Sequence, residues 1–440
     1  MKRICLLLAF VSIAAAESTV IRNATVITVT QGTFQGDILV RDGKIAQVGE
    51  KLITPLGARV IDAGGQFVMP GIIDAHSHIS AEGVNEAGTS VSSMTRIEDV
   101  FNAESISIYR ALAGGVTTVD VMHGSANAIG GSCAIIKTRW GKDAEGLLFK
   151  GASPGLKFAL GENPKRLGAP ARNEAARRYP ATRMGVEDVI RAAFTEAKNY
   201  RQSWIDYRAK ASAGANPIPP RRDLKLEPLV EVLAGKRRVH VHAYRSDEIL
   251  MMIRVADSFG FKITCFEHGL EAYKVAKEIA THGAAVATFS DWWAYKVEAF
   301  DAIPYNAALL TRKGVLTSLK SDDPEMMRRL NVEAAKTIKY GGLTEKEALS
   351  LITINPAKEL GIEKRVGSIE VGKDADLTIF DKHPLSAYAK VQKVFIDGTL
   401  YFDRERDKSE RPARQSRRKA LLDKAREEQQ KSEKPARSLP

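Results

Sequence analysis

The chain has 440 residues, of which 44% are hydrophobic and 27% are charged, and its formal net charge is +12. This composition excludes a fibrous or wholly disordered protein and provides enough apolar material for one large domain or two ordinary ones. After the N-terminal segment, no apolar run reaches the length of a membrane-spanning helix.

The first 16 residues have the pattern of a secretory signal peptide. A basic start and an apolar stretch over 4–13 precede small residues at 14–16 that suit cleavage. A short membrane anchor is the weaker alternative, because the apolar run is too short to span a bilayer comfortably. We therefore expect an exported protein, secreted or periplasmic, without stable membrane insertion after cleavage. Its remaining cysteines, Cys133 and Cys265, are expected to be buried free thiols.

Two β-rich segments flank the middle of the chain. Residues 17–66 contain β-branched runs with a hairpin signal at Asp42-Gly43, and residues 366–402 repeat the style with Asp397-Gly398. We expect the two chain ends to assemble one small β-sandwich domain.

The middle segment, residues 67–365, alternates apolar β runs with helical patterns. Its eight strand candidates are FVMPGIIDA, VTTVDVM, CAIIKTRW, GLKFAL, RRVHVHA, KITCFEHG, AAVATFS and VLTSLKS. Eight runs threaded by helices predict an α/β fold of the (β/α)8 TIM-barrel type. Such a barrel has its active site at the carboxyl ends of the strands, so chemistry is expected there.

Histidines gather at the ends of these strands. VMPGIIDAHSHIS places His76 and His78 on one face, because side chains alternate along a strand. RRVHVHA repeats the spacing with His240 and His242, and KITCFEHG ends in His268. Their shared end of the barrel favours a metal site over hydrogen-bonded core histidines.

The last strand candidate ends in two acids, Asp322 and Asp323. Imidazole and carboxylate ligands with one open position are what a catalytic zinc-type site requires, and Zn, Mn, Fe, Co or Ni would all accept them. A metal there lowers the pKa of a bound water to near neutrality, and a carboxylate can take up the proton and pass it to the leaving group.

These motifs resemble the amidohydrolase superfamily, and the nearest pattern is its imidazolonepropionase-like branch. The resemblance runs from about Ser18 to Phe402 and rests on MPGIIDAHSHI, GGVTTV, HA, EHG and INPAKELGI followed by VGSIEVGKDADLTIFD. It implies a metal-dependent hydrolase that cleaves a C–N bond of an amide, cyclic amide or dipeptide. The implied cofactor is one or two divalent ions, with Zn expected first.

The resemblance also implies roles for particular residues. The family positions that match His76, His78, His242 and His268 bind metal, and the position that matches Asp322 is both ligand and general base. Asp323 aligns less well.

The family commonly adds a ligand after strand four, either a carboxylated lysine or a glutamate. GLKFALGENPKR offers Lys157 and Glu162. We favour Glu162 because it lies past the strand end, whereas Lys157 is expected deeper in the barrel. The number of metal ions stays open.

Several features bear on the substrate. The long, basic insertion over 163–222 is either a lid or a solvated helical excursion. Arg245, just beyond His242, is a candidate for binding a free substrate carboxylate. Trp292 is expected to wall the pocket or to pack in its loop, and His240 to contact substrate or to pack one layer deeper.

Two further functions compete with amide hydrolysis: an N-acetyl-sugar deacetylase-like activity, and a catalytically inactive barrel that acts as a binding or scaffold protein. The basic tail, residues 403–440, is expected to be disordered or a solvated helix. Export makes nucleic acid an unsuitable partner, so the expected partner is a small-molecule substrate. Homo-oligomerisation is left open by the sequence.

Overall fold

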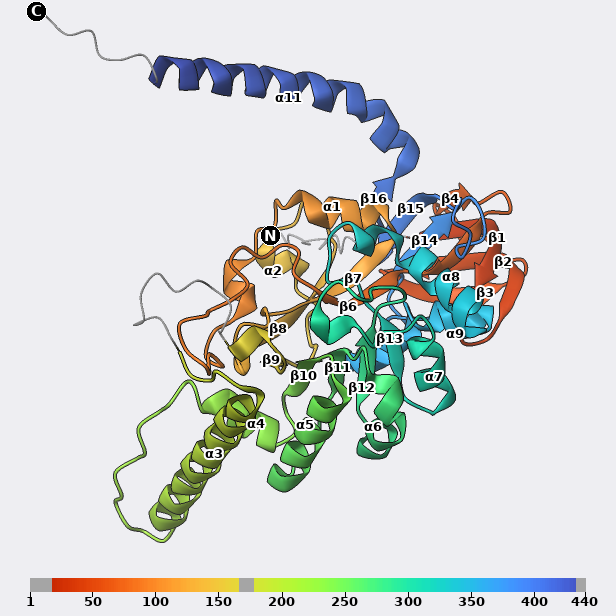
Figure 1. Ribbon diagram of the computed structural model, residues 1–440. Coiled ribbons are helices and arrows are strands. Elements are labelled where there is room, and N and C mark those ends of the chain that lie inside the picture. The colour runs from red at the N-terminus through yellow and green to blue at the C-terminus, as the bar shows by residue number, and fades with distance from the viewer. Residues whose placement is uncertain (1–17, 166–177, 433–440) are drawn as a thin grey trace, which may run out of the picture.

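The computed structural model describes residues 18–165 and 178–432. The expected signal peptide, a part of the long insertion and the last residues of the tail lie outside these ranges. In the described residues, two eight-stranded sheets share the chain (Figure 1).

The first sheet is built from both ends of the chain. Its strands are β1 (Ser18–Ile27), β2 (Thr33–Arg41), β3 (Lys44–Gly49), β4 (Arg59–Asp62), β5 (Phe67–Pro70), β14 (Leu377–Phe380), β15 (Val391–Ile396) and β16 (Thr399–Asp403). They form one continuous sheet in the order β16-β15-β14-β5-β1-β2-β3, with β4 paired to β1. The turn between β2 and β3 is tight because Asp42 and Gly43 both adopt positive φ, 50° and 77°.

The second sheet forms the barrel, with β13 beside β6, which confirms the predicted (β/α)8 fold class. Its strands are β6 (Ile72–Ser77), β7 (Val116–Val121), β8 (Ile129–Lys137), β9 (Gly155–Ala159), β10 (Arg238–Ala243), β11 (Cys265–His268), β12 (Ala285–Thr288) and β13 (Thr317–Leu319). Asp74 on β6 accepts a hydrogen bond from the backbone N–H of Ser321 (3.0 Å). The backbone N–H of Asp322 donates to the carbonyl of His76 (3.0 Å), so the segment after β13 is tied to β6.

Two details of the barrel differ from the expected strands. FVMPGIIDA divides, because β5 joins the first sheet and only β6 enters the barrel. Strand β8 is antiparallel to both of its neighbours. The physical reason is the short link between β7 and β8, since a parallel strand needs a long crossover and an antiparallel strand does not.

Most of the helices cover the outside of the barrel, and the last one forms the C-terminal tail. They are α1 (Ile106–Ala113), α2 (Ala144–Leu147), α3 (Arg183–Ser212), α4 (Glu227–Leu233), α5 (Ser246–Phe259), α6 (Ala276–His282), α7 (Asn306–Arg312), α8 (Leu330–Gly341), α9 (Glu345–Ser350), α10 (Ile354–Glu359) and α11 (Arg404–Ser432). Helix α9 begins with a capping box formed by Thr344 and Glu347.

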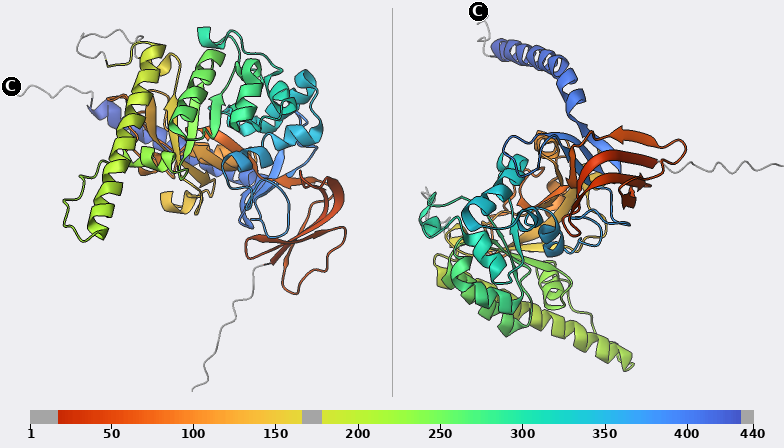
Figure 2. Two further views of the ribbon diagram at one scale, coloured as in Figure 1. Left: turned by 90° about the horizontal axis from the view of Figure 1, so that it is seen from below. Right: turned by 90° about the vertical axis from the view of Figure 1, so that its right-hand side faces the viewer.

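The described part of the long insertion packs against the barrel. The buried face of α3, from Val186 to Ala197, joins the core formed with β9, β10 and α5. The C-terminal part of the helix extends away from the barrel (Figure 2). The helix therefore serves mainly as a barrel helix, because its apolar face is buried against strands.

The tail is helical over Arg404–Ser432, so the solvated helix describes it better than a disordered chain. Among the described residues, no helix is long and apolar enough to cross a membrane. Cys133 and Cys265 are both buried and free, as expected.

Candidate metal centre

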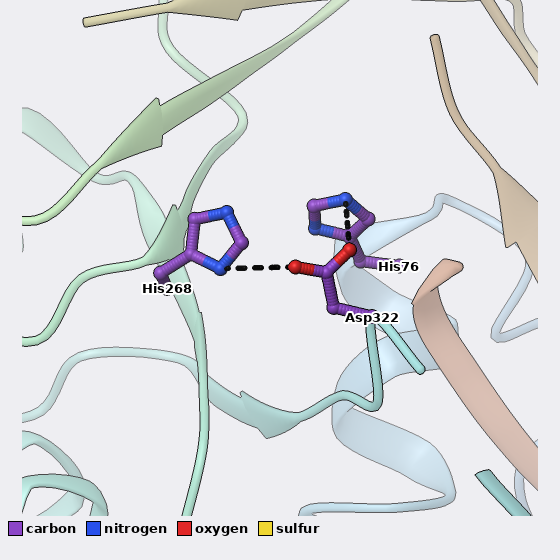
Figure 3. Close-up of side chains that lie close together, drawn as sticks. All are labelled: His76, His268 and Asp322. Carbon is purple, nitrogen blue, oxygen red and sulfur yellow. Dashed lines mark ion pairs between the residues drawn. The ribbon is translucent and has the colours of Figure 1, made fainter. Parts of the chain in front are cut away.

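The barrel brings the predicted ligands together at the carboxyl ends of its strands. His76 lies on β6, His242 on β10 and His268 at the end of β11, while His78 and Asp322 follow β6 and β13. His76, His268 and Asp322 each offer a ligand atom within 4.8 Å of the other two (Figure 3). Residues far apart in the sequence therefore converge on one small volume.

Asp322 faces three of the histidines. Its Oδ1 lies 3.1 Å from Nε2 of His78 and 3.6 Å from Nε2 of His76, and its Oδ2 lies 3.8 Å from Nδ1 of His268. Asp322 and His268 both adopt positive φ, 55° and 72°, which is uncommon for residues other than glycine. The backbone at two strand ends is thus held in unusual conformations that direct these side chains.

Nδ1 of His76 and Nδ1 of His78 each form a hydrogen bond on the side of the ring away from Asp322. Nδ1–H of His76 donates to Oε2 of Glu267 (3.0 Å), and Nδ1–H of His78 donates to the carbonyl of Met122 (2.8 Å). These bonds leave both Nε2 atoms directed toward Asp322. Such support fixes the tautomer and the ring orientation of metal-binding histidines.

His242 and His268 form the opposite side of the cluster. Nδ1 of His242 lies 2.8 Å from Nε2 of His268 and 2.9 Å from the hydroxyl of Ser125. Nε2 of His242 is buried and has no hydrogen-bond partner among the described residues. Burial, followed by nearby lysines, lowers the pKa of His76, His242 and His268 well below the usual value, so these rings are neutral and able to act as ligands.

The structure places Lys157 at the cluster and Glu162 outside it, against the preference drawn from the sequence. Nζ of the fully buried Lys157 lies 3.0 Å from Nε2 of His76. Glu162 is 42% exposed and pairs with Lys296 at 3.3 Å. Lys157 does lie deep on β9, in register with His240, but its long side chain reaches up to the ligand layer.

Lys320 was not found by sequence reasoning. It is buried directly after β13, with Nζ 2.5 Å from Nδ1 of His268 and 3.4 Å from Oδ2 of Asp322. Burial lowers its pKa to about 8. The sequence did contain a signal for it, because Lys320 is a charged residue within VLTSLKS, a run otherwise suited to a buried strand.

The remaining predicted residues lie around or below the cluster. His240 packs one layer deeper, where Nδ1–H donates to Oε1 of Glu267 (2.9 Å). Arg245 forms a two-pronged ion pair with Asp247 at the surface. Asp323 caps the next turn by accepting from the N–H of Met326 (2.7 Å).

Aromatic rings line one side of the cluster. Tyr244, another residue that sequence reasoning missed, stacks on His268 at 4.9 Å between ring centroids. The hydroxyl of Tyr295 donates to that of Tyr244 (2.7 Å). Trp292 stacks on Phe289 (4.5 Å), which in turn stacks on His268 (5.5 Å). Trp292 therefore borders the cluster through Phe289.

The donor set suits a divalent ion of the zinc type. It contains neutral imidazole nitrogens and an ionised carboxylate, which are ligands that Zn, Mn, Fe, Co and Ni accept. The buried Nε2 of His242, without a hydrogen-bond partner among the described residues, is the kind of atom that such an ion would satisfy.

Comparisons with known proteins identify the family of the chain. The amidohydrolase family profile matches residues 67–401. The amidohydrolase tasK of Hapsidospora irregularis is 32% identical over 84% of the chain, which spans 40% of that protein. A dihydroorotase of Pelotomaculum thermopropionicum is 26% identical, with 82% of this chain and 88% of that protein covered.

A solved structure extends the likeness to the fold. An amidohydrolase from Thermotoga maritima is 40% identical, with a TM-score of 0.80, and the match covers 88% of this chain and 100% of that one. The chain belongs to the amidohydrolase family, whose members are hydrolases that act on carbon–nitrogen bonds.

Proposed function

We propose that this protein is an exported amidohydrolase that cleaves the C–N bond of a small amide, cyclic amide or dipeptide. The observation that carries the proposal is the convergence of four histidines and Asp322 at the mouth of the barrel. The family supports a metal-dependent hydrolase, whereas the substrate and the export are our inferences.

The residues that would hold the metal are His76, His78, His242, His268 and Asp322. With a divalent ion bound by these residues, the pKa of a coordinated water would fall to near neutrality. Lys157 would join as a ligand only after its neutral amine adds CO2 and loses a proton, which gives a carbamate.

Asp322 is the proposed general base. Burial alone would raise its pKa, but Lys320, with Nζ 3.4 Å from Oδ2, holds the pKa well below its usual range. The carboxylate is therefore ionised at neutral pH and able to take a proton from the attacking water. It can then give that proton to the nitrogen of the leaving group.

Two basic side chains near the mouth are already paired with carboxylates. Arg245 is already paired with Asp247, and Lys296 lies 3.3 Å from both Glu162 and Glu298. Burial raises the pKa of Tyr244, so its hydroxyl, which accepts from Tyr295 (2.7 Å), stays protonated and able to donate to a substrate carbonyl. The aromatic rings offer apolar contact to the rest of the substrate.

The test is hydrolysis by protein loaded with Zn or Mn and purified without the first 16 residues. Cyclic amides, dipeptides, N-acyl amino acids and N-acetyl sugars are offered in turn, and the hydrolysis products are measured by mass spectrometry. We expect turnover of at least one of the first three classes, and loss of it in His76→Asn/His78→Asn. Turnover of N-acetyl sugars alone would favour the deacetylase alternative, and no turnover of any class would favour a scaffold.

Export has a separate test, because it rests on the N-terminal sequence alone. The full-length chain is expressed in a bacterial host that exports through signal peptides, and the N-terminus of the purified product is sequenced. We expect a mature chain that begins near Glu17. An intact N-terminus in the cytosolic fraction would contradict export and leave the hydrolase proposal unaffected.

A further inference from the structure

A network of charged side chains joins three elements near the mouth. Arg183 is the first residue of α3, Glu248 lies in the first turn of α5, and Glu298 lies in the connection between β12 and α7. Nη1 of Arg183 donates to Oε2 of Glu248 (2.5 Å), and Nη2 donates to Oε1 of Glu298 (2.7 Å). Both glutamates are buried, whereas the Arg183 side chain is 28% exposed. One guanidinium group therefore serves two buried carboxylates that belong to different elements.

The same two glutamates hold the backbone after β9. Oε1 of Glu248 accepts from the N–H of Gly161 (2.8 Å), and Oε1 of Glu298 accepts from the N–H of Glu162 (2.8 Å). Gly161 has a φ of 83°, and a Cβ atom there would lie 2.7 Å from Oε1 of Glu298. The glutamate thus approaches the backbone more closely than a residue with a side chain would allow. The end of β9, the start of α5 and the β12–α7 connection consequently meet at the guanidinium group of Arg183.

Glu298 also links this network to the metal centre. Nζ of Lys296 lies 3.3 Å from Oε2 of Glu298 and 4.1 Å from the centre of the Tyr244 ring. A cation over an aromatic ring at such a distance is attracted to it. Tyr244 stacks on His268, and the hydroxyl of Tyr295, the neighbour of Lys296, donates to that of Tyr244. Direct contacts therefore run from the buried glutamate to a proposed metal ligand.

The two buried carboxylates depend on the cation that they share. Burial raises the pKa of Glu248, and Arg183 opposes that shift, whereas the nearby Glu298 adds to it. Removal of the guanidinium group would leave the two glutamates as neighbouring buried like charges, which is strongly unfavourable. The first turn of α5 cannot easily move, because Ile249 is packed in the core. The β12–α7 connection can move, since Val297 within it is 75% exposed.

We propose that Arg183 is a positioning residue of the mouth. Through Glu298 it holds the β12–α7 connection in place. The connection then keeps Lys296 and Tyr295 against Tyr244, and this contact fixes the wall along which a substrate lies beside the metal ligands. The effect of Arg183 on substrate is indirect, because it acts through Glu298 and the connection. The inference rests on the proposed function, since the position of the wall matters only if the mouth binds a substrate.

Hydrogen–deuterium exchange tests the placement of the connection in the full-length protein. Arg183→Met removes the guanidinium group, and we expect residues 289–305 to exchange at least about tenfold faster than in the wild type. Arg191→Met is the matched control, since Arg191 lies further along α3 and pairs with Glu187. It should leave the exchange of residues 289–305 unchanged. Wild-type exchange of this segment in Arg183→Met would overturn the proposal.

A second variant keeps the test decisive if Arg183→Met does not fold. Glu298→Gln preserves the size of the side chain and removes the charge that pairs with Arg183 and Lys296. We expect faster exchange over residues 289–305 and nearly unchanged exchange over α5. Equal acceleration over both segments would indicate a general loosening of the barrel and would contradict a specific role in placing the connection.

Kinetics separate positioning of substrate from a merely structural role. With a substrate identified by the hydrolysis test above, Arg183→Met should raise KM at least about tenfold and leave kcat and the metal content near the wild-type values. Arg183→Lys, which keeps the positive charge, should recover part of this loss. A lower kcat at an unchanged KM would exclude a role in substrate placement. A wild-type protein that hydrolyses no substrate would count against the proposed function alone, because the exchange experiment decides whether Arg183 places the connection.

Discussion

Two regions of this barrel bury lysine side chains, and their surroundings are opposite in kind. Lys137, at the end of β8, contacts Asp374, Asp376 and Asp397 at 2.8, 3.0 and 2.6 Å. Lys157 and Lys320, at the mouth, instead face nitrogen atoms of His76 and His268.

The pKa values follow this difference. Burial alone would lower the pKa of Lys137, but the three carboxylates raise it above the usual value. Burial lowers the pKa of Lys320 to about 8, although Asp322 and Glu267 partly oppose the shift. Lys137 is therefore a stable ion that joins β8 to the segments around β14 and β15. Lys320, in contrast, has a lowered pKa and lies beside Nδ1 of His268. The charged cluster around Lys137 therefore stabilises the fold, whereas the buried lysines at the mouth belong to the candidate metal centre.

The largest expected effect is at Asp322. Asp322→Asn should lower kcat by about 10³-fold, because the amide cannot take up the proton of the attacking water. The far-UV circular dichroism spectrum and Tm should stay near those of the wild type. Asp323→Asn is the matched control, since Asp323 caps a turn, and it should turn over normally. A kcat of Asp322→Asn within tenfold of the wild type would exclude the base role.

The next test compares the two candidates for the strand-four ligand. Lys157→Met should lower kcat/KM by at least about 10²-fold, above the loss typical of residues that only orient a ligand, and it should lower the metal content. Glu162→Gln should leave kcat/KM and the metal content within about twofold of the wild type, because Glu162 pairs with Lys296 outside the cluster. The reverse pattern would restore the preference drawn from the sequence.

Lys137→Met should affect stability and leave chemistry intact. Removal of one partner from a buried ion cluster costs about 3–5 kcal/mol of unfolding free energy. Urea unfolding measures this loss, and kcat of the folded fraction should be unchanged. Lys142→Met, at an exposed lysine on the same connection, is the control. A destabilisation of Lys137→Met below about 1 kcal/mol would mean that the cluster adds little.

Asp374 gives the Lys137 cluster a pH dependence. Burial alone would raise its pKa, but Lys137, Lys44 and Arg365 lower it from 3.8 to about 2. A lowered folded-state pKa stabilises the fold above the unfolded pKa, and this stabilisation of about 2 kcal/mol disappears as pH falls from about 4 toward 2. Asp374→Asn should be destabilised at pH 6, and its difference from the wild type should narrow by pH 2.5. A constant difference would contradict this origin.

The smallest effect is expected at the end of α11. Side chains in the first turns hold the helix, for example Asp407 with Tyr109 (2.7 Å), whereas residues 415–430 are exposed. Deletion from Gln415 onward should change the unfolding free energy by no more than about 0.5 kcal/mol and leave kcat unchanged. Loss of binding to anionic vesicles without a change in kcat would give the tail a separate role.

Part of the site could be predicted because strand periodicity is local. The alternation in DAHSH and RVHVHA places alternate histidines on one face, and the order of strands then gathers their ends. The direction of β8 was not predicted, although the short link that determines it is visible in the sequence.

The sequence correctly predicted that the backbone of Lys157 lies deep in the barrel, but it did not predict that the side chain extends to the metal ligands. Backbone register fixes where a Cα atom lies, but a lysine side chain spans the distance between two layers of the barrel. Tyr244 shows the same limit, since its stacking on His268 depends on how β10 and β11 lie side by side.

The sequence by itself determined the barrel strands, the β-rich chain ends and the histidines and aspartate of the mouth, because short-range alternation and turn chemistry encode them. Only the tertiary structure decided that Lys157 replaces Glu162 at the cluster and that Glu267 supports both His76 and His240. Those relations join residues from different strands, and the distances between them are set by the closure of the barrel, which no local pattern contains.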